Sequence, residues 1–323
     1  MSDDHRKLLQ GIDFEESQEK RRTELLKIQK HQRATAQDSL RFQIDIEKIE
    51  STEYRNFKKT YKQKYGIEYF LQQAEWFKHR PQDLDDWFVV PYPKGMRCLV
   101  IACGGRTEVY SRKGHLITYF KSCLPGGGLN VYSKNRLTIL DCVQIEKNKR
   151  YQVLDALVSG CQEFLTCEAS FRFYWTKSRI EEWEENGNFK VRFEAPNFFD
   201  MAKEVDFTHC FQKYPFFSED TELDAFMFYH KESSYTCGTT PLVGWLYPFM
   251  VEEILGFQVN EGYEASKPEA YEDARSYMAI FDEALKEKRK AKSRRRKTDV
   301  EMEELDETVE LEMEEVEGEE QMQ

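Results

Sequence analysis

The sequence predicts an α+β protein in which a twisted body of two antiparallel sheets follows an N-terminal helical region. Three observations support this class. Short apolar runs, separated by glycine, proline and charged turn residues, recur between residues 87 and 231. Aromatic residues make up 14% of the 323-residue chain, which is typical of a strand-rich core. Residues 12–65 contain neither glycine nor proline, which favours helix there.

The strands of the body are expected mainly as pairs joined by short turns. In chain order, the expected strands are 87–90, 98–102, 108–110, 116–120, 137–143, 151–156, 171–175 and 223–231. Short helices are expected at about 176–185, 200–206 and 249–254. Antiparallel strands at this spacing, with few helices between them, favour two packed sheets.

Changes in composition divide the chain into four expected parts. These are a helical region (1–50), a helical linker (51–68), the folded domain (69–262), and a helix followed by a charged tail (263–323). From Asp299 onward there are thirteen acidic residues and no basic one, which accounts for the net charge of −12. The rest of the chain is therefore almost neutral and can bind a nucleic acid locally. The basic block Lys286–Lys297 and the acidic tail are typical of disordered segments; a regulated signal or partner site is the alternative.

Several classes of site are not expected. No apolar run approaches the roughly 18 residues of a membrane span, and the N-terminus has no signal-peptide stretch. The eight cysteines form no C-x-x-C pair, so we expect reduced thiols in a cytosolic or nuclear protein. The six histidines are scattered, and His230 is expected to be a hydrogen-bonded strand residue. We therefore expect no metal, no cofactor and no membrane partner.

Short motifs resemble, in order, those of covalent nucleotidyltransferases, the mRNA capping enzymes and DNA ligases. Their motif K-x-D-G-x-R is similar to Tyr92–Arg97, S-R-x-G to Tyr110–Gly114, and D-G-E-L to Leu140–Val143. The capping-enzyme run D-G-L-I-F, followed by Y-x-x-G-T and L-L-K-W-K, resembles Asp224–Phe228 and then Tyr235, Gly238 and Trp245.

The reactive groups of these motifs are missing. Tyr92 stands where the nucleophilic lysine is expected, the metal-associated glutamate is absent, and Gly244 and Leu246 replace the lysines beside the tryptophan. Forming a nucleotide–lysine bond needs an amine of lowered pKa and cations that neutralise the phosphate. The sequence thus predicts a nucleotide-binding scaffold with no catalytic residue. A guanylyltransferase or ligase with relocated reactive groups is the alternative.

A second set of motifs resembles the snurportin family from about Glu75 to Gly256. The carriers are Glu75-Trp76, Asp86–Val90, Leu124–Gly127, Phe171–Trp175, Phe228–Lys231 and Thr240–Leu246. The resemblance implies a cap-binding domain similar to the capping-enzyme core. It also implies a non-enzymatic adaptor that shuttles between cytoplasm and nucleus and imports small nuclear ribonucleoproteins (snRNPs) by binding the trimethylguanosine cap of spliceosomal U snRNAs. A general cap-binding protein without a transport role is a further alternative.

The family resemblance assigns roles at the cap. Trp245 matches the tryptophan that stacks on the base, and Trp76 matches the one near the N2 methyl groups. Arg97 and Arg112 match basic positions near the cap and its phosphates, and Ala74 stands where the family often has serine. Stacking suits this ligand because a 7-methylated guanine is flat and positively charged. Trp87 and Trp175 are expected to be core residues.

The N-terminal stretch Glu19–Lys30 resembles the importin-β-binding segment of snurportins and importin α. The resemblance implies that Arg21, Arg22, Leu25, Lys27 and Lys30 contact importin β or a related import receptor. An apolar cluster precedes this stretch. Its residues are Leu8, Leu9, Ile12 and Phe14, and it is interpreted either as a leucine-rich export signal for an exportin or as the apolar face of a short helix.

Overall fold

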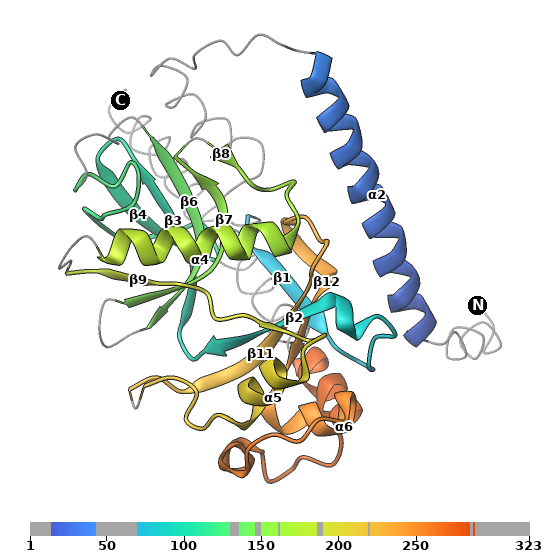
Figure 1. The fold of residues 1–323 in the computed structure, drawn as a ribbon. Helices are drawn as coiled ribbons and strands as arrows, with labels where there is room; N and C mark the ends of the chain where they lie inside the picture. Colours follow the sequence, from blue (N-terminus) through green and yellow to red (C-terminus); the bar gives the residue numbers. More distant parts are fainter. Residues whose placement is uncertain are drawn as a thin grey trace, which may run out of the picture. The chain divides into compact units, whose positions relative to one another are not determined.

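The computed structural model describes residues 14–42, 70–129, 136–145, 150–160, 162–185, 190–218, 220–284 and 287. It contains a long N-terminal helix, two β-sheets and shorter helices around them, which confirms the α+β class (Figure 1). The chain divides into two units, Met1–Lys267 and Pro268–Gln323. In the second unit, residues 274–284 are helical. None of the helices among the described residues combines the length and the apolar character that crossing a membrane requires.

The first sheet has five strands in the order β1-β12-β11-β2-β10. Their bounds are β1 Gln72–Trp76, β12 Gly238–Leu246, β11 Leu223–His230, β2 Trp87–Pro93 and β10 Phe199–Asp200. Neighbouring strands are antiparallel except β1 and β12, which run parallel and bring Trp76 opposite Trp245. Strand β1 forms one edge of this sheet.

The second sheet has the order β5-β4-β3-β6-β7-β8, and β9 pairs with β7. Its strands are β3 Met96–Cys103, β4 Arg106–Ser111, β5 Leu116–Phe120, β6 Leu137–Ile145, β7 Arg150–Ser159, β8 Gln162–Glu163 and β9 Arg192–Glu194. The predicted pairs β4–β5 and β6–β7 are confirmed. Only Lys94 and Gly95 separate β2 from β3, so the chain crosses there from the first sheet to the second.

The expected strand at 171–175 is wrong, because these residues form part of α4 (Ala169–Glu185). Aromatic residues favour strands, but here the packing follows a helical period. Phe173, Thr176 and Ile180 are buried, whereas Phe171 and Tyr174 are exposed. Trp175, expected in the core, is partly buried against the second sheet's cluster.

The remaining helices are α5 (Glu204–Gln212), α6 (Val251–Leu255) and three 3₁₀ turns: η2 (Leu84–Asp86), η4 (Pro248–Met250) and η5 (Glu261–Ser266). Helices α5 and α6 and the turn η4 lie near expected places, whereas the turns η2 and η5 were not expected. The helix expected at 200–206 begins only at Glu204, because Phe199 and Asp200 pair with β2 as β10.

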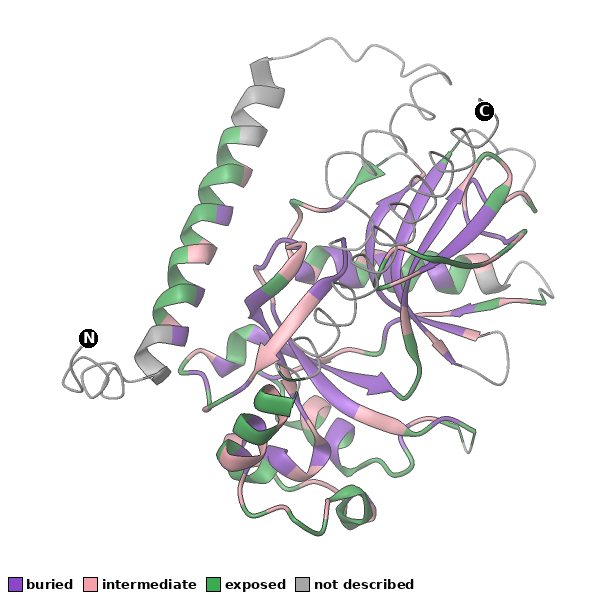
Figure 2. Ribbon diagram, turned by 180° about the vertical axis from the view of Figure 1, so that it is seen from behind, coloured by how far each residue is buried: buried purple, intermediate pink, exposed green. Residues whose placement is uncertain are grey.

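The core follows the alternation of strand side chains. In β3, Val100 and its even-numbered neighbours pack on the face of the second sheet that carries α4, while Leu99 and Ile101 pack on the opposite face. A third cluster joins the two sheets and α4. Its buried members are Phe88, Val90, Tyr92, Val143, Leu154, Phe173, Ala225, Met227, Tyr229 and Val243. Figure 2 shows the strands as mostly buried.

The long helix α2 (Phe14–Phe42) lies beside the β1–β12 edge (Figures 1 and 2). The side chains that it directs to the body are polar: Gln18, Arg22 and Gln29 are buried, and Arg33 is partly buried. Their spacing places them on one side of the helix. A polar contact stripe explains why the sequence shows no regular apolar period in this helix.

Gly244 is required by a close approach in the first sheet. A Cβ atom at this position would lie 2.5 Å from two ring carbons of the buried Phe77. We expect Gly244→Ala to lower the free energy of unfolding by about 1–3 kcal/mol, as overpacked cores do. Urea unfolding measures this loss.

The control for this substitution is Thr239→Ala, which changes an exposed residue of the same strand. Its effect should stay within about 0.5 kcal/mol. An equal, small effect of both substitutions would contradict the close-packing explanation.

Candidate functional site

A cavity of about 560 Å³ opens where the chain crosses between the sheets. Its lining residues come from β2, β3 and the turn between them, the end of β4 and the turn after it, β11 and β12. They are Tyr92, Gly95, Met96, Arg97, Ser111, Arg112, Lys113, Asp224 and Trp245. Three of the predicted site residues, Trp245, Arg97 and Arg112, therefore meet in one open cavity.

Trp245 lines the cavity and packs against Tyr92. Tyr92 meets its ring edge to face, with 5.0 Å between ring centroids and planes at 70°. The neighbours in β12 point to the other face of the sheet, where Gly244 abuts Phe77 and Leu246 is fully buried. A lysine on either side of Trp245 would therefore point into the core and away from the cavity.

Tyr92 lacks the properties of a nucleophile. Burial raises the pKa of its hydroxyl to about 12, with Arg97 opposing this shift and Asp141 adding to it. The phenol is therefore neutral at physiological pH, whereas a nucleophile must be deprotonated or activated by a base. Lys94, the nearest lysine in sequence, is exposed and pairs with Glu222 at 2.6 Å.

Arg97 lines the cavity, but Asp141 already balances its charge. Its Nε donates to Asp141 Oδ1 at 2.9 Å and its Nη2 to Oδ2 at 2.6 Å. Burial opposes the charged form of Arg97, but Asp141 outweighs burial and raises the arginine pKa well above its usual value. Most of this guanidinium is therefore engaged within the protein. Arg112 and Lys113 are exposed and also line the cavity.

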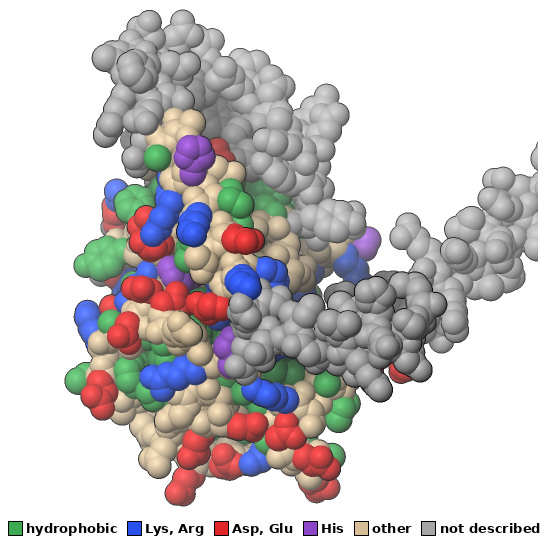
Figure 3. All heavy atoms as spheres, turned by 90° about the vertical axis from the view of Figure 1, so that its right-hand side faces the viewer, with side chains coloured by type: hydrophobic (Ala, Val, Ile, Leu, Met, Phe, Trp, Pro, Cys, Tyr) green, Lys and Arg blue, Asp and Glu red, His purple; other side chains and the backbone are tan. Residues whose placement is uncertain are grey.

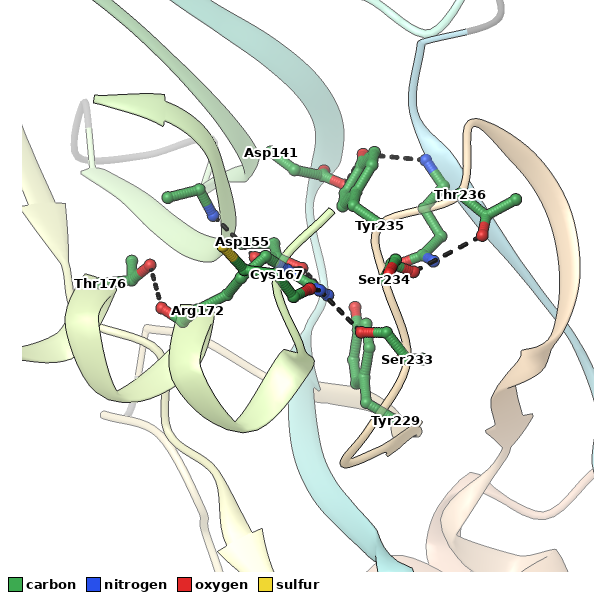
Figure 4. A network of polar contacts seen from close by, with 12 residues as sticks. Asp141, Asp155, Cys167, Arg172, Thr176, Tyr229, Ser233, Ser234, Tyr235 and Thr236 are labelled. Atoms are coloured by element: carbon green, nitrogen blue, oxygen red, sulfur yellow. Dashed lines mark hydrogen bonds and ion pairs between the residues drawn. The ribbon is translucent and has the colours of Figure 1, made fainter. Parts of the chain in front are cut away.

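Asp141 also links the second sheet to the edge of the first. The Tyr235 hydroxyl donates to Asp141 Oδ2 at 2.8 Å and accepts a bond from the backbone N–H of Gln72 at 2.9 Å (Figure 4). Gln72 is the first residue of β1. The buried carboxylate thus positions Arg97 under the cavity and, through Tyr235, the strand that carries Trp76.

A second buried ion pair fixes α4 against the body (Figure 4). Arg172 Nη2 lies 2.9 Å from Asp155 Oδ2, and Arg172 Nη1 donates to the carbonyl oxygens of Cys167 and Ser233. Both charged side chains are almost fully buried. Each nitrogen of the guanidinium has an oxygen partner, since Nε also donates to Asp155, and such pairing is the condition under which buried charges are tolerated.

Trp76 and Ala74 are not among the lining residues of the cavity. Trp76 is opposite Trp245 on the neighbouring strand, and both rings lie near Tyr247, at centroid distances of 5.8 and 6.1 Å. Ala74 is opposite Thr240 and packs against the cluster between the sheets. Their roles at a ligand remain predictions.

Sequence reasoning missed two charged residues of the cavity, Lys113 and Asp224. Lys113 lies next to Arg112 in the hairpin turn. The motif S-R-x-G identifies this turn, but only its arginine was predicted to be a site residue. Asp224 opens the motif at Asp224–Phe228, but nothing in the sequence shows that its side chain lines the cavity.

His230 is a hydrogen-bonded strand residue, as predicted. Its Nε2 lies 3.3 Å from Asp83 Oδ2, and its Nδ1 accepts a bond from the N–H of Glu232. Among the described residues, the potential ligand atoms of Asp83, Asp86 and His230 lie within 4.8 Å of one another. The other oxygen of Asp83 accepts from the Trp87 indole at 3.0 Å, so hydrogen bonds account for the positions of Asp83 and His230.

The predicted receptor-binding residues lie on α2, and three of them contact the body. Arg22 is buried, stacks over the rings of Phe77 and Trp87, and donates to the carbonyl oxygen of Pro241 at 3.1 Å. The partly exposed pairs are Arg21 with Glu75 and Lys30 with Glu232, both at 2.7 Å.

The other two predicted receptor-binding residues are less engaged: Leu25 is partly buried and Lys27 is exposed. Figure 3 views the molecule from the side on which α2 lies and shows basic and acidic side chains interspersed. Leu8, Leu9 and Ile12 of the apolar cluster, and most of the charged C-terminal blocks, lie outside the described residues.

Comparison with known proteins gives one family match. The family described as "Snurportin1, m3G cap-binding domain" matches residues 70–248, which include both sheets and every residue that lines the cavity.

Solved DNA ligases show a more distant similarity. A mycobacterial DNA ligase D complexed with ATP and MES is 13% identical, with a TM-score of 0.37, over 55% of this chain and 60% of that chain. The ligase domain of M. tuberculosis LigD is 13% identical, with a TM-score of 0.34, over 55% of this chain and 57% of that one. This chain thus spans less than two thirds of the length of either ligase chain.

Asp141 should be a major source of stability. We expect Asp141→Ala to lower the free energy of unfolding by about 3–5 kcal/mol, because Arg97 would keep a buried charge without its partner. Urea unfolding followed by circular dichroism measures the change.

The matched control is Lys94→Ala, which breaks an exposed ion pair at the rim of the same region. It should leave the unfolding midpoint unchanged. A loss below about 1 kcal/mol for Asp141→Ala would show that the carboxylate does not stabilise the junction of the sheets.

Proposed function

The chain belongs to the snurportin cap-binding-domain family, and on that basis we propose that it binds the 2,2,7-trimethylguanosine cap of U snRNAs in the cavity around Trp245 and serves as an snRNP import adaptor. The observation that carries the proposal is the match of the family over residues 70–248, the segment that builds this cavity. The function is recognition without a covalent step, because Tyr92 is a buried neutral phenol where the related enzymes have lysine.

The cavity offers groups suited to each part of the cap. The trimethylated base is flat and carries a positive charge, so it stacks on the indole of Trp245. The phosphate bridge is anionic and suits the exposed Arg112 and Lys113, since charged donors form strong bonds to phosphate oxygens. Trp76 is opposite Trp245 on the neighbouring strand, which supports a role at the base edge that carries the N2 methyl groups.

The adaptor role requires α2 to bind importin β or a related import receptor. Receptor contacts of Arg21, Arg22 and Lys30 would compete with the contacts that these residues make to the body. The N-terminal helix is therefore available in full only when it leaves the β1–β12 edge. Its release also uncovers the Pro241 carbonyl, which costs free energy unless water satisfies it.

Trp245 should dominate cap affinity. We expect Trp245→Ala to weaken binding of a trimethylated cap dinucleotide at least tenfold, because stacking of one base contributes about 1–3 kcal/mol. Isothermal titration calorimetry measures this without relying on the lost fluorophore.

Tyr174→Ala is the control, since this aromatic side chain is 73% exposed on α4 and does not line the cavity. Its affinity should match that of the unsubstituted protein. An unchanged affinity of folded Trp245→Ala would remove this ring from the site, and equal affinities of the unsubstituted protein for trimethylated and monomethylated caps would contradict the stated specificity.

Glu75 should restrain the receptor-binding helix. We expect Glu75→Gln to raise the affinity for importin β about two- to fivefold, because it removes the ion pair with Arg21, and such partly exposed pairs are worth about 0.2–1 kcal/mol. Biolayer interferometry with the full chain measures the change. The control is Glu222→Gln, which removes an acidic residue that pairs with Lys94, a residue outside α2. Unchanged or weaker binding by Glu75→Gln would show that docking and receptor binding do not compete.

A further inference from the structure

Asp224 occupies an irregular position at the start of β11. In the pairing of β11 with β2, Leu223 is opposite Pro93 and Ala225 is opposite Tyr92, so Asp224 is an extra residue without a partner. Such bulges redirect a side chain and are common next to binding sites. Here the residue at the bulge, Asp224, lines the same cavity as Trp245.

The carboxylate of Asp224 has no hydrogen-bond or ion-pair partner among the described residues. The charge of Lys94 acts on this carboxylate, but Lys94 forms its ion pair with Glu222. Burial raises the pKa of the Asp224 carboxyl, Lys94 opposes this shift and Glu222 adds to it. A half-buried acid that is destabilised in this way gains from a cation that enters the cavity.

The two walls of the cavity differ in charge. Trp245 and Asp224 belong to neighbouring strands of the first sheet, whereas Arg112 and Lys113 lie at the end of a strand of the second. The first wall therefore suits a flat, positively charged group, and the second suits an anion. A carboxylate on the first wall also disfavours a phosphate there.

We infer that Asp224 is a specificity-determining residue that recognises the positive charge of the 7-methylated guanine base stacked on Trp245. The inference rests on the proposed cap-binding function and adds a group that detects the charge of the base. Methylation of N7 makes the base cationic, while the same base without that methyl group is neutral. A stacking ring favours the cationic base, and a carboxylate in the lining of the same cavity increases that preference because opposite charges attract in a partly buried site.

The test uses two cap dinucleotides that differ only in the N7 methyl group, one with a 2,2,7-trimethylguanosine and one with a 2,2-dimethylguanosine. Affinities of the full chain are measured by calorimetry for the unsubstituted protein and for Asp224→Asn, which keeps the shape but removes the charge. We expect Asp224→Asn to lose about tenfold in affinity for the trimethylated ligand and less than about twofold for the dimethylated one, as the loss of a charge-assisted contact predicts.

Glu222→Gln is the matched control, because it removes the same charge two residues away, outside the cavity lining. It should leave the ratio of the two affinities unchanged. A loss of equal size for both ligands in Asp224→Asn would overturn the inference, and so would the same change of ratio in Glu222→Gln. Thermal unfolding of each variant shows that it is folded.

The affinities distinguish a failure of the proposed cap binding from a failure of the role of Asp224. If the unsubstituted protein binds neither dinucleotide, the proposed function itself is wrong and the inference falls with it. If it binds the trimethylated ligand through Trp245 but Asp224→Asn keeps the full preference for the N7 methyl group, only the role of Asp224 is rejected.

Discussion

The buried carboxylate of Asp141 is the interaction on which the cavity depends. The chain leaves the first sheet at Pro93 and enters the second at Met96, and the cavity lies at this crossing. Asp141 binds Arg97 in the second sheet and Tyr235 ahead of β12, and Tyr235 in turn holds the first N–H of β1. A buried charge must be paired and fully hydrogen-bonded, so these three contacts fix one another's geometry. The cavity wall and the strand beside Trp245 are thus positioned by one group.

These contacts distinguish the cavity from a catalytic site. The motif arginine is committed to a protein carboxylate, the nucleophile position holds a buried phenol, and the flanks of the motif tryptophan point into the core. What remains accessible is an aromatic ring, two exposed cations and one carboxylate. These groups suit non-covalent recognition of a charged, flat base with phosphates, and none of them is an activated nucleophile.

The sequence predicts the features that depend on local pattern. Alternating apolar runs and turn residues identify the hairpins, and the motif order places Trp245, Arg97 and Arg112 in one cavity. The features that the sequence does not predict depend on tertiary packing. The aromatic run at 171–175 favours a strand, but Arg172 finds its partner Asp155 and Phe173 finds the core only when the segment is helical. The position of Asp224 depends on a register shift against β2, which no pattern within β11 reveals. The position of Trp76 likewise depends on the pairing of β1 with β12, which the residues around Trp76 do not reveal.

Helix α2 contacts the first sheet where the pairing of β1 with β12 is irregular. Strand β1 is an edge strand, and in its pairing with β12 the register jumps from Ala74–Thr240 to Glu75–Gly244. The jump leaves the carbonyl of Pro241 without a ladder partner, and an edge strand leaves some of its own carbonyls unpaired. Arg22 satisfies the first, and the Gln18 side chain donates to the Trp76 carbonyl.

The polar stripe of α2 is therefore explained by the backbone that it covers. Because Glu75 binds the helix and the next residue, Trp76, stands beside Trp245, the helix contact and the edge of the cavity share a single strand. Backbone hydrogen bonds hold that strand on one side only, so the docked helix contributes to the position of Trp76.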